Sequence, residues 1–229
     1  MTGEPLGAVD LKLYFLGRRD YVNGLTMFEE MVKAFESYPS SRVVRPILIR
    51  QFRFNRFVRS HARMEILAMP PGQPAERPVL KGENARVDLM APGADFTLLL
   101  LEKPEEPVAT SLPEYDRGVY IAEQENRPDG TVSAEMANVH DAFELLRGIV
   151  EVMQRITDQE LQALTGRPKS YWGYIKGYPF LLDERAAGVH SVLFEKSSII
   201  RGRDRMFAVR QVRLEGPEGN APAEICYFS

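Results

Sequence analysis

The stretch that decides the fold is Asn23-Gly24-Leu25-Thr26-Met27-Phe28-Glu29-Glu30-Met31-Val32-Lys33-Ala34-Phe35. Its apolar side chains recur every three or four residues, which predicts a helix with a wide apolar face. Asn23 and Gly24 suit the N-terminal cap of this helix, and Pro39 suits its end. A helix with so wide an apolar face has to be buried, and a curved sheet wrapped around it would bury it.

The residues around this helix have the patterns of β-strands. A short strand is expected at 11–15, before the helix, and further strands at 47–58, 63–69, 85–90 and 95–102. Ala91-Pro92-Gly93-Ala94 predicts a hairpin turn between the last two. Residues 104–117 contain three prolines and four acidic residues, and we expect them to form a linker.

The second half of the chain follows the same order of elements. Strands are expected at 118–124 and 131–136, and a helix with a wide apolar face begins near Ala142. The spacing Thr157-Asp158-Gln159-Glu160 is typical of a capping box and predicts that a short second helix begins there and ends at Gly166. Strands are then expected at 171–182, 189–194, 206–214 and 223–228.

The two halves also match in sequence. A shift of 126 places Ile49-Arg50-x-Phe52-x-Phe54 on Ile175-Lys176-x-Tyr178-x-Phe180, and Ile66-Leu67 on Val192-Leu193. Several matches in order at a nearly constant offset indicate an internal duplication. We therefore predict an N-terminal repeat at 1–103, a linker at 104–117 and a C-terminal repeat at 118–229.

Composition excludes several classes of protein. The chain is 44% hydrophobic and 27% charged, as globular proteins are, and its net charge of −3 argues against a nucleic-acid-binding protein. It contains no apolar run long enough to cross a membrane and no secretory signal. With three histidines and the single cysteine Cys226, neither a disulfide nor a metal site is expected, and the expected location is the cytoplasm.

The residues before and within the first helix resemble the signature of a known family. Tyr14-Phe15-Leu16-Gly17, Asn23-Gly24-Leu25 and Phe28-Glu29 resemble the signature of hot-dog-fold 3-hydroxyacyl-ACP dehydratases, which has His-Phe-Pro-Gly, then Pro-Gly, then Glu five residues after that glycine. Arg53-Phe54-x-x-Phe57-Val58 resembles the strand that closes over the acyl chain in that family. With the duplication, the resemblance implies an α+β double hot-dog, in which two long central helices are each wrapped by a curved antiparallel sheet.

The resemblance implies a protein that binds an acyl thioester, carried by an acyl carrier protein or by CoA, and that dehydrates a 3-hydroxyacyl group as a lyase without a cofactor. Tyr14 stands where the family has its catalytic histidine. One alternative is therefore a catalytically inactive member that serves in binding or assembly, and another is an acyl thioesterase. Further association of such pseudo-dimers into a homo-oligomer is also compatible with the resemblance.

Most candidate site residues lie around the first helix. Free N–H groups at Asn23, Gly24 and Leu25 could hold a thioester carbonyl, although these residues could equally form only a cap and turn. Glu29 is the candidate acid or base, with a solvated helix glutamate as the alternative. Tyr14 could donate a hydrogen bond to the substrate or be an ordinary strand aromatic. Phe54 is assigned to the acyl chain by the resemblance.

The start of the second helix carries His140, Asp141 and Glu144. Polyketide synthase dehydratase domains have an aspartate at the central helix of their second half, and Asp141 lies in about that place. His140 could supply the imidazole that is missing at Tyr14. The alternative is that both carboxylates favour the helix dipole and that the histidine is structural.

Seven arginines lie between Arg42 and Arg63 without an acidic residue among them. Phosphate groups of a thioester carrier, an acidic carrier protein or a nucleic acid would each be attracted by this run. The alternative is an exposed strand face that its charge keeps soluble.

Overall fold

The computed structural model describes residues 3–39, 47–71, 81–166, 171–181, 187–203, 205–216 and 219–228, and the chain divides into two compact units, 1–115 and 116–229. The elements of the first unit are β1 (Glu4–Leu11), β2 (Phe15–Leu16), α1 (Gly24–Glu36), β3 (Leu48–Phe54), β4 (Ser60–Met69), β5 (Glu83–Ala91), β6 (Ala94–Pro107) and β7 (Ser111–Leu112). Those of the second are η1 (Arg117–Tyr120), β8 (Ile121–Asn126), β9 (Val132–Met136), α2 (Ala142–Thr165), β10 (Tyr171–Leu181), β11 (Ser191–Phe194), β12 (Ser198–Arg201), β13 (Met206–Gly216) and β14 (Gly219–Phe228).

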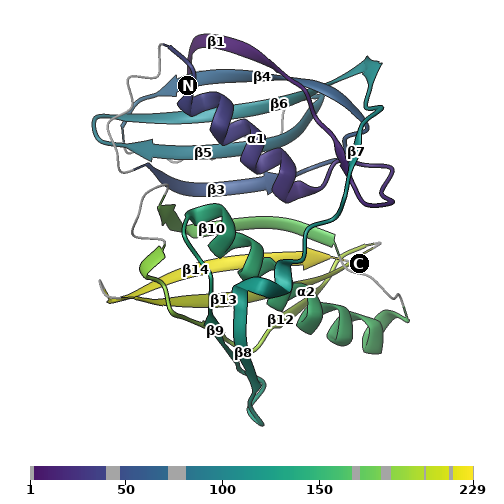
Figure 1. Cartoon of the computed structure of the whole chain (residues 1–229), viewed down its shortest axis with the longest axis vertical. Helices are drawn as coiled ribbons and strands as arrows, with labels where there is room; N and C mark the ends of the chain where they lie inside the picture. The colour runs from purple at the N-terminus through teal and green to yellow at the C-terminus, as the bar shows by residue number, and fades with distance from the viewer. Residues whose placement is uncertain are drawn as a thin grey trace. The chain divides into compact units, whose positions relative to one another are not determined.

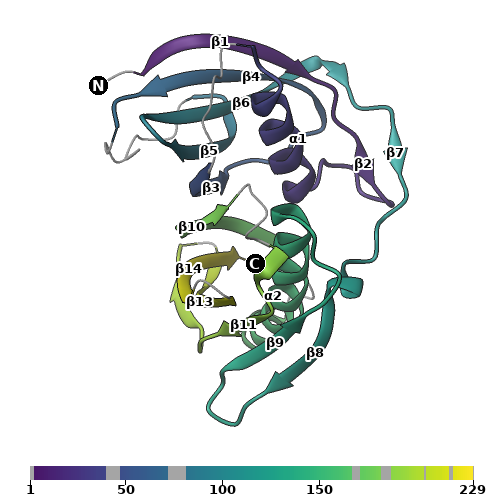
Figure 2. The ribbon, with the colours of Figure 1, turned by 60° about the vertical axis from the view of Figure 1, so that its left-hand side comes forward.

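The first unit is one helix packed against one antiparallel sheet. Its strands are ordered β1-β4-β6-β5-β3, and Figures 1 and 2 show α1 lying against the sheet, which curves around it. Phe28 of α1 meets Phe52 of β3 with ring centroids 5.1 Å apart, and Phe35 meets Phe96 of β6 at 5.0 Å. All four rings are buried, so this aromatic layer is the core of the unit, as the apolar face of the helix predicted.

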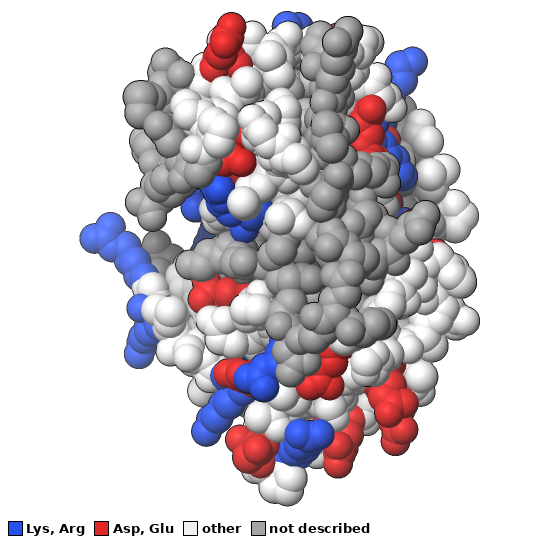
Figure 3. Space-filling view, turned by 90° about the vertical axis from the view of Figure 1, so that its left-hand side faces the viewer, with Lys and Arg blue, Asp and Glu red and all other residues white. Residues whose placement is uncertain are grey.

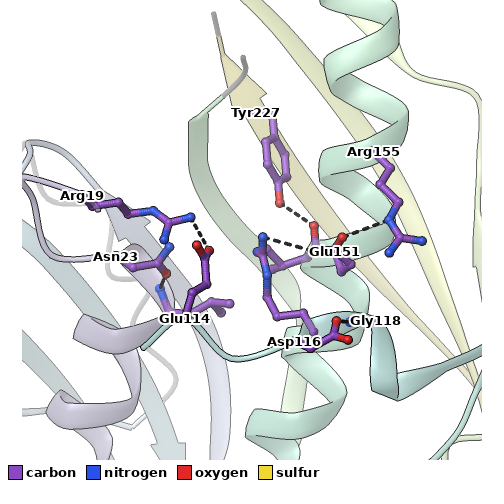
Figure 4. Close-up of polar contacts among 11 residues, drawn as sticks. Arg19, Asn23, Glu114, Asp116, Gly118, Glu151, Arg155 and Tyr227 are labelled. Carbon is purple, nitrogen blue, oxygen red and sulfur yellow. Dashed lines mark hydrogen bonds and ion pairs between the residues drawn. The ribbon is translucent and has the colours of Figure 1, made fainter. Parts of the chain in front are cut away.

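The second unit has the same two parts. Its strands are ordered β8-β9-β11-β13-β14-β10, with β12 paired to β13, and α2 packs against them. The buried Tyr227 of β14 donates a hydrogen bond to the Val150 carbonyl of α2 at 3.2 Å. Glu151 on the next position of the helix pairs with Arg117 of η1 at 3.0 Å and with Arg155 at 2.9 Å (Figure 4). These contacts hold η1 and β14 to the middle of α2.

The two units differ in the order of their last strands. In the first unit β6 lies between β4 and β5, so that β4 and β5 are parallel, whereas in the second β11, β13 and β14 are consecutive neighbours. The expectation that the second half repeats the first therefore holds for the helix, for the strand before it and for the strand after it. It fails for the final hairpin. Two connected strands of a hairpin can exchange places when the connection before them is long, and β4 ends at Met69 whereas β5 begins only at Glu83.

Several predicted boundaries were wrong. No second helix begins at Thr157, because α2 continues to Thr165 and ends at Gly166, which has a left-handed φ of 70°. Thr157 lies on the buried face of α2, and Glu160 bonds to Arg210 of β13 instead of to the backbone at Thr157. The apolar face thus continues through the apparent capping box.

Other elements also begin or end elsewhere than predicted. β6 continues to Pro107 and takes the first part of the expected linker, and η1 occupies the start of the expected strand at 118–124. The expected strand at 11–15 is divided between the end of β1 and β2. β12 has no counterpart in the predicted elements. The hairpin turn at 91–94 is confirmed, with Gly93 at a φ of 84° and Ala91 opposite Ala94.

Candidate functional site at the start of the first helix

The start of α1 is built as its sequence predicted. Asn23 is the N-cap, and its side-chain oxygen accepts a hydrogen bond from the Leu25 N–H at 2.9 Å. The Met27 N–H donates to the Asn23 carbonyl at 3.0 Å. Among the residues that the structure describes, no acceptor bonds the N–H groups of Gly24 and Thr26. Of the predicted amides, that of Leu25 is occupied by the cap and that of Gly24 remains available, while the available Thr26 amide was not among those predicted.

The loop before this helix start is braced from two sides. The Phe15 and Gly17 N–H groups donate to the carbonyls of Thr110 and Leu112, at 3.0 and 2.9 Å, so that β2 and β7 pair in parallel. On the other side, the Val22 N–H donates to the Val58 carbonyl at 2.8 Å. The helix start is therefore held in place by backbone bonds to segments far away in the sequence.

An ion pair adds to this bracing. Arg19 lies 2.6 Å from Glu114, as Figure 4 shows, and it also donates to the Leu16 carbonyl at 3.1 Å. Burial alone would lower the pKa of Arg19, but the bond to Glu114 and a contribution from Tyr21 raise it above its ordinary value. This pair was not predicted, because no spacing pattern relates two residues that lie near opposite ends of the first unit's sequence.

Glu29 is buried within the second turn of α1. Its side chain is 5% exposed, whereas that of the adjacent Glu30 is 27% exposed. Lys33, which is itself 54% exposed, lies 3.8 Å from the Glu29 carboxylate and 3.6 Å from that of Glu30. A carboxylate this buried, about one turn from two available N–H groups, is the strongest feature of the candidate site, because carboxylates rarely lie in a core without a specific role.

The other two predicted residues of the first unit are half-buried. Tyr14 lies in the segment between β1 and β2. Phe54 is the last residue of β3, and its ring packs edge-on against Phe57 at 5.8 Å. Near Tyr14, the Leu13 N–H donates to Nδ1 of His61 at 3.1 Å, a contact that sequence analysis did not foresee.

The predicted residues at the start of α2 form a helix cap. Asp141 is the N-cap and accepts a hydrogen bond from the Glu144 N–H at 2.8 Å, while the Glu144 carboxylate accepts one from the His140 N–H at 2.8 Å. Both carboxylates therefore accept backbone hydrogen bonds at the helix start, in an arrangement related to the capping box. His140 is exposed, and its ring has no partner among the described residues.

Two buried ionic clusters were also missed. In the first unit, Asp88 of β5 accepts hydrogen bonds from Arg86 at 3.0 Å and from Thr97 at 2.7 Å, all three buried. Burial raises the pKa of Asp88, although Arg86 and Thr97 oppose the shift. In the second unit, Arg210 is fully buried and bonds to Glu160. Strand periodicity placed Arg86, Asp88, Thr97 and Arg210 on strands, and Glu160 was assigned to a capping box, but neither pattern indicated their partners.

Two other site types receive no support from the described part of the chain. It holds no group of three or more His, Cys, Asp or Glu residues that could bind a metal ion. No helix within it is long and apolar enough to cross a membrane. On the face drawn in Figure 3, basic and acidic side chains are interspersed.

No protein-family model matches the sequence, and a search of curated proteins also finds no match. Several solved structures are similar to the chain over most of its length. One is a tesB protein of Mycobacterium avium subsp. paratuberculosis, with 13% identity and a TM-score of 0.44, covering 99% of this chain and 95% of that one. Another is a conserved protein of unknown function with a hot-dog fold from Alicyclobacillus acidocaldarius, with 12% identity and a TM-score of 0.43, covering 96% of this chain and 90% of that one.

A third similar structure is a dehydratase from type I polyketide synthases, with 11% identity and a TM-score of 0.38, covering 91% of this chain and 84% of that one. Identities this low concern the fold alone and assign no substrate. The chain is similar to hot-dog proteins, and each unit contains the helix and antiparallel sheet that the sequence resemblance implied.

Proposed function

We propose that the chain binds an acyl thioester at the start of α1 and hydrolyses it, with Glu29 as the general base. The observation that supports this proposal is the burial of the Glu29 carboxylate about one turn from the available N–H groups of Gly24 and Thr26. Fixed amides aimed at a carbonyl stabilise the negative charge that develops on its oxygen, and a nearby carboxylate can activate water.

The reaction requires only these groups. The Glu29 carboxylate takes a proton from a water molecule, and the water oxygen forms a bond to the thioester carbonyl carbon. The carbonyl oxygen becomes an oxyanion that the Gly24 and Thr26 amides stabilise. When the oxyanion re-forms the carbonyl, the C–S bond breaks, and the thiolate takes the proton from Glu29. The Leu25 amide has no part in this step, because Asn23 occupies it.

Dehydration of a 3-hydroxyacyl thioester is the second candidate, favoured by the burial of Glu29 five residues after Gly24, the spacing of the dehydratase signature. There the Glu29 carboxylate would take the α-proton and deliver it to the leaving hydroxyl group, and Tyr14 would donate a hydrogen bond to the substrate.

The test measures thiol release from acyl-CoA and enoyl formation from 3-hydroxyacyl-CoA with the same protein. Glu29→Gln is compared with Glu30→Gln, a matched control, because both glutamates approach Lys33 but Glu30 is more exposed. We expect Glu29→Gln to lower the rate of thiol release by about 100-fold or more, in the range of general base catalysis, and Glu30→Gln to leave it within about twofold. Equal effects of the two variants would overturn the assignment of Glu29.

The two assays also separate the candidate reactions. Thiol release without enoyl formation supports hydrolysis, whereas enoyl formation that Glu29→Gln abolishes supports dehydration. If neither product forms and Tyr14→His creates activity, the chain is a non-catalytic binding protein. If no acyl thioester binds at all, the proposed function is wrong.

A further inference from the structure

The arginine run contains two kinds of arginine in the described part of the chain. Arg50 is neutralised by Asp95 at 3.1 Å. Arg59 lies 3.6 Å from Asp20, but both of these side chains are more than half exposed, so this surface pair is weak and the Arg59 guanidinium remains accessible to a phosphate. Arg53 and Arg56 have no side-chain partner among the described residues. A net-negative chain thus keeps cationic groups unneutralised around the end of β3.

Half-buried aromatic rings lie beside these cations. Tyr21 and Phe57 have ring centroids 4.8 Å apart, and Phe54 packs against Phe57. The core pair of Phe28 and Phe52, by contrast, is fully enclosed. Aromatic rings that retain exposed surface next to arginines are the combination that binds a nucleobase by stacking and phosphates by ionic hydrogen bonds.

The loop that carries these groups, residues 55–59, is held by hydrogen bonds from its backbone at both ends. The Asn55 and Arg56 N–H groups both donate to the Asn84 carbonyl, at 2.8 and 3.1 Å. The Arg59 and Ser60 N–H groups both donate to the Glu102 carboxylate, at 2.5 and 2.9 Å. The loop therefore holds its side chains in place before a ligand arrives, which lowers the entropic cost of binding.

Arg53 lies on the face of β3 that points away from α1. Phe52 points toward α1, since it contacts Phe28. Arg53 is the next residue and pairs in register with Arg86, so its side chain is on the opposite face of the sheet. Arg56 and Arg59 instead belong to the loop that carries Phe57, which itself contacts Tyr21 just before the start of α1.

We propose that a surface beside the start of α1 binds the adenosine phosphates of a coenzyme A thioester, a proposal that rests on the proposed function. This nucleotide surface consists of Tyr21, Phe54, Phe57, Arg56 and Arg59. The adenine ring stacks on the aromatic side chains, and the two arginines bind the phosphates. The same loop bonds to Val22, directly before the Asn23 cap, so the surface is continuous with the thioester site.

A carrier protein would need a different surface. A stable protein–protein interface buries about 800 Å² of each partner, and electrostatic attraction to an acidic protein requires a broad basic face. Among the described residues of the run, Arg50 and Arg59 already lie beside carboxylates, which reduces the basic charge that such a face could offer. A compact pair of arginines with exposed aromatic rings fits a nucleotide better.

The experiment compares the dissociation constants of acyl-CoA and acyl-pantetheine by calorimetry at two salt concentrations. Acyl-pantetheine carries the same thioester without the nucleotide. We expect the parent protein to bind acyl-CoA at least about 10-fold more tightly, and higher salt to reduce this advantage. The variant Arg56→Gln/Arg59→Gln should lose about 10-fold or more in acyl-CoA affinity and nothing in acyl-pantetheine affinity.

Arg53→Gln is the matched control, because it removes an unpartnered cation from the other face of β3, and it should change neither affinity by more than about twofold. Equal binding of the two thioesters by the parent protein overturns the nucleotide surface and leaves the proposed function intact. Preference for an acyl carrier protein over acyl-CoA, or an equal loss in Arg53→Gln, also overturns it. If neither thioester binds, both proposals fail.

Discussion

Removal of the Glu160 charge is predicted to destabilise the second unit more than removal of its partner. The Arg210 side chain is fully buried, whereas that of Glu160 is 32% exposed. Arg210 also donates to the Glu195 carbonyl, and Glu160 accepts a hydrogen bond from Ser197 at 2.9 Å. Glu160→Gln leaves a guanidinium charge in the core without a counter-charge. Arg210→Met leaves a carboxylate that already reaches solvent.

The magnitudes follow from this asymmetry. Breaking a buried ion pair costs about 3–5 kcal/mol when the remaining charge stays buried. Glutamine can still accept a hydrogen bond from Arg210, so we expect a loss of about 2–3 kcal/mol in the free energy of unfolding. Methionine fills the space between the buried Ala208 and Val212 with apolar atoms, and we expect Arg210→Met to cost about 1 kcal/mol or less.

Urea unfolding followed by circular dichroism measures both values. With an m-value on the order of 2 kcal/mol/M, Glu160→Gln should lower the midpoint of the second unit by about 1–1.5 M, and Arg210→Met by about 0.5 M or less. The reasoning is refuted if Arg210→Met is the more destabilising of the two. It is also refuted if Glu160→Gln leaves the midpoint unchanged.

Three further outcomes are expected. Asn23→Ala should lower the free energy of unfolding of the first unit by about 1 kcal/mol in a urea titration, because the Leu25 N–H loses its acceptor. Thr157→Val should raise that of the second unit by about 1 kcal/mol in the same assay, since the buried Thr157 hydroxyl has no partner in the described chain. Hydrogen bonds from the Thr131 hydroxyl and N–H lower the pKa of Asp129, so this group stabilises the fold above its unfolded pKa, and the effect disappears as pH falls through the folded pKa. Carboxyl NMR titration should show the lowered pKa in the parent protein and a higher one in Thr131→Val.

Local patterns predicted the parts of the fold that depend on neighbouring residues. The cap at Asn23, the apolar face of α2 and the turn around Gly93 were identified because each depends on a few adjacent side chains. The candidate site was likewise found through the spacing from Gly24 to Glu29. Burial then supports the choice of Glu29 over Glu30 that this spacing had predicted.

Features that depend on distant residues could not be predicted in this way. The Arg19–Glu114 and Arg210–Glu160 pairs join residues that no periodicity relates. Glu160 was assigned to a capping box, because the sequence does not reveal that a buried arginine competes for its carboxylate. The exchanged order of β5 and β6 could not be predicted, because strand patterns specify strands without their neighbours.

The most direct test of the proposed thioester site is amide NMR of the uniformly ¹⁵N-labelled protein during titration with a non-hydrolysable acyl-pantetheine thioether ketone. The account predicts saturable shifts of the Gly24 and Thr26 amide resonances, with smaller shifts for Leu25, whose N–H the Asn23 side chain already binds. Shifts that are absent at millimolar ligand, or that leave the start of α1 unaffected while other segments respond, would contradict it.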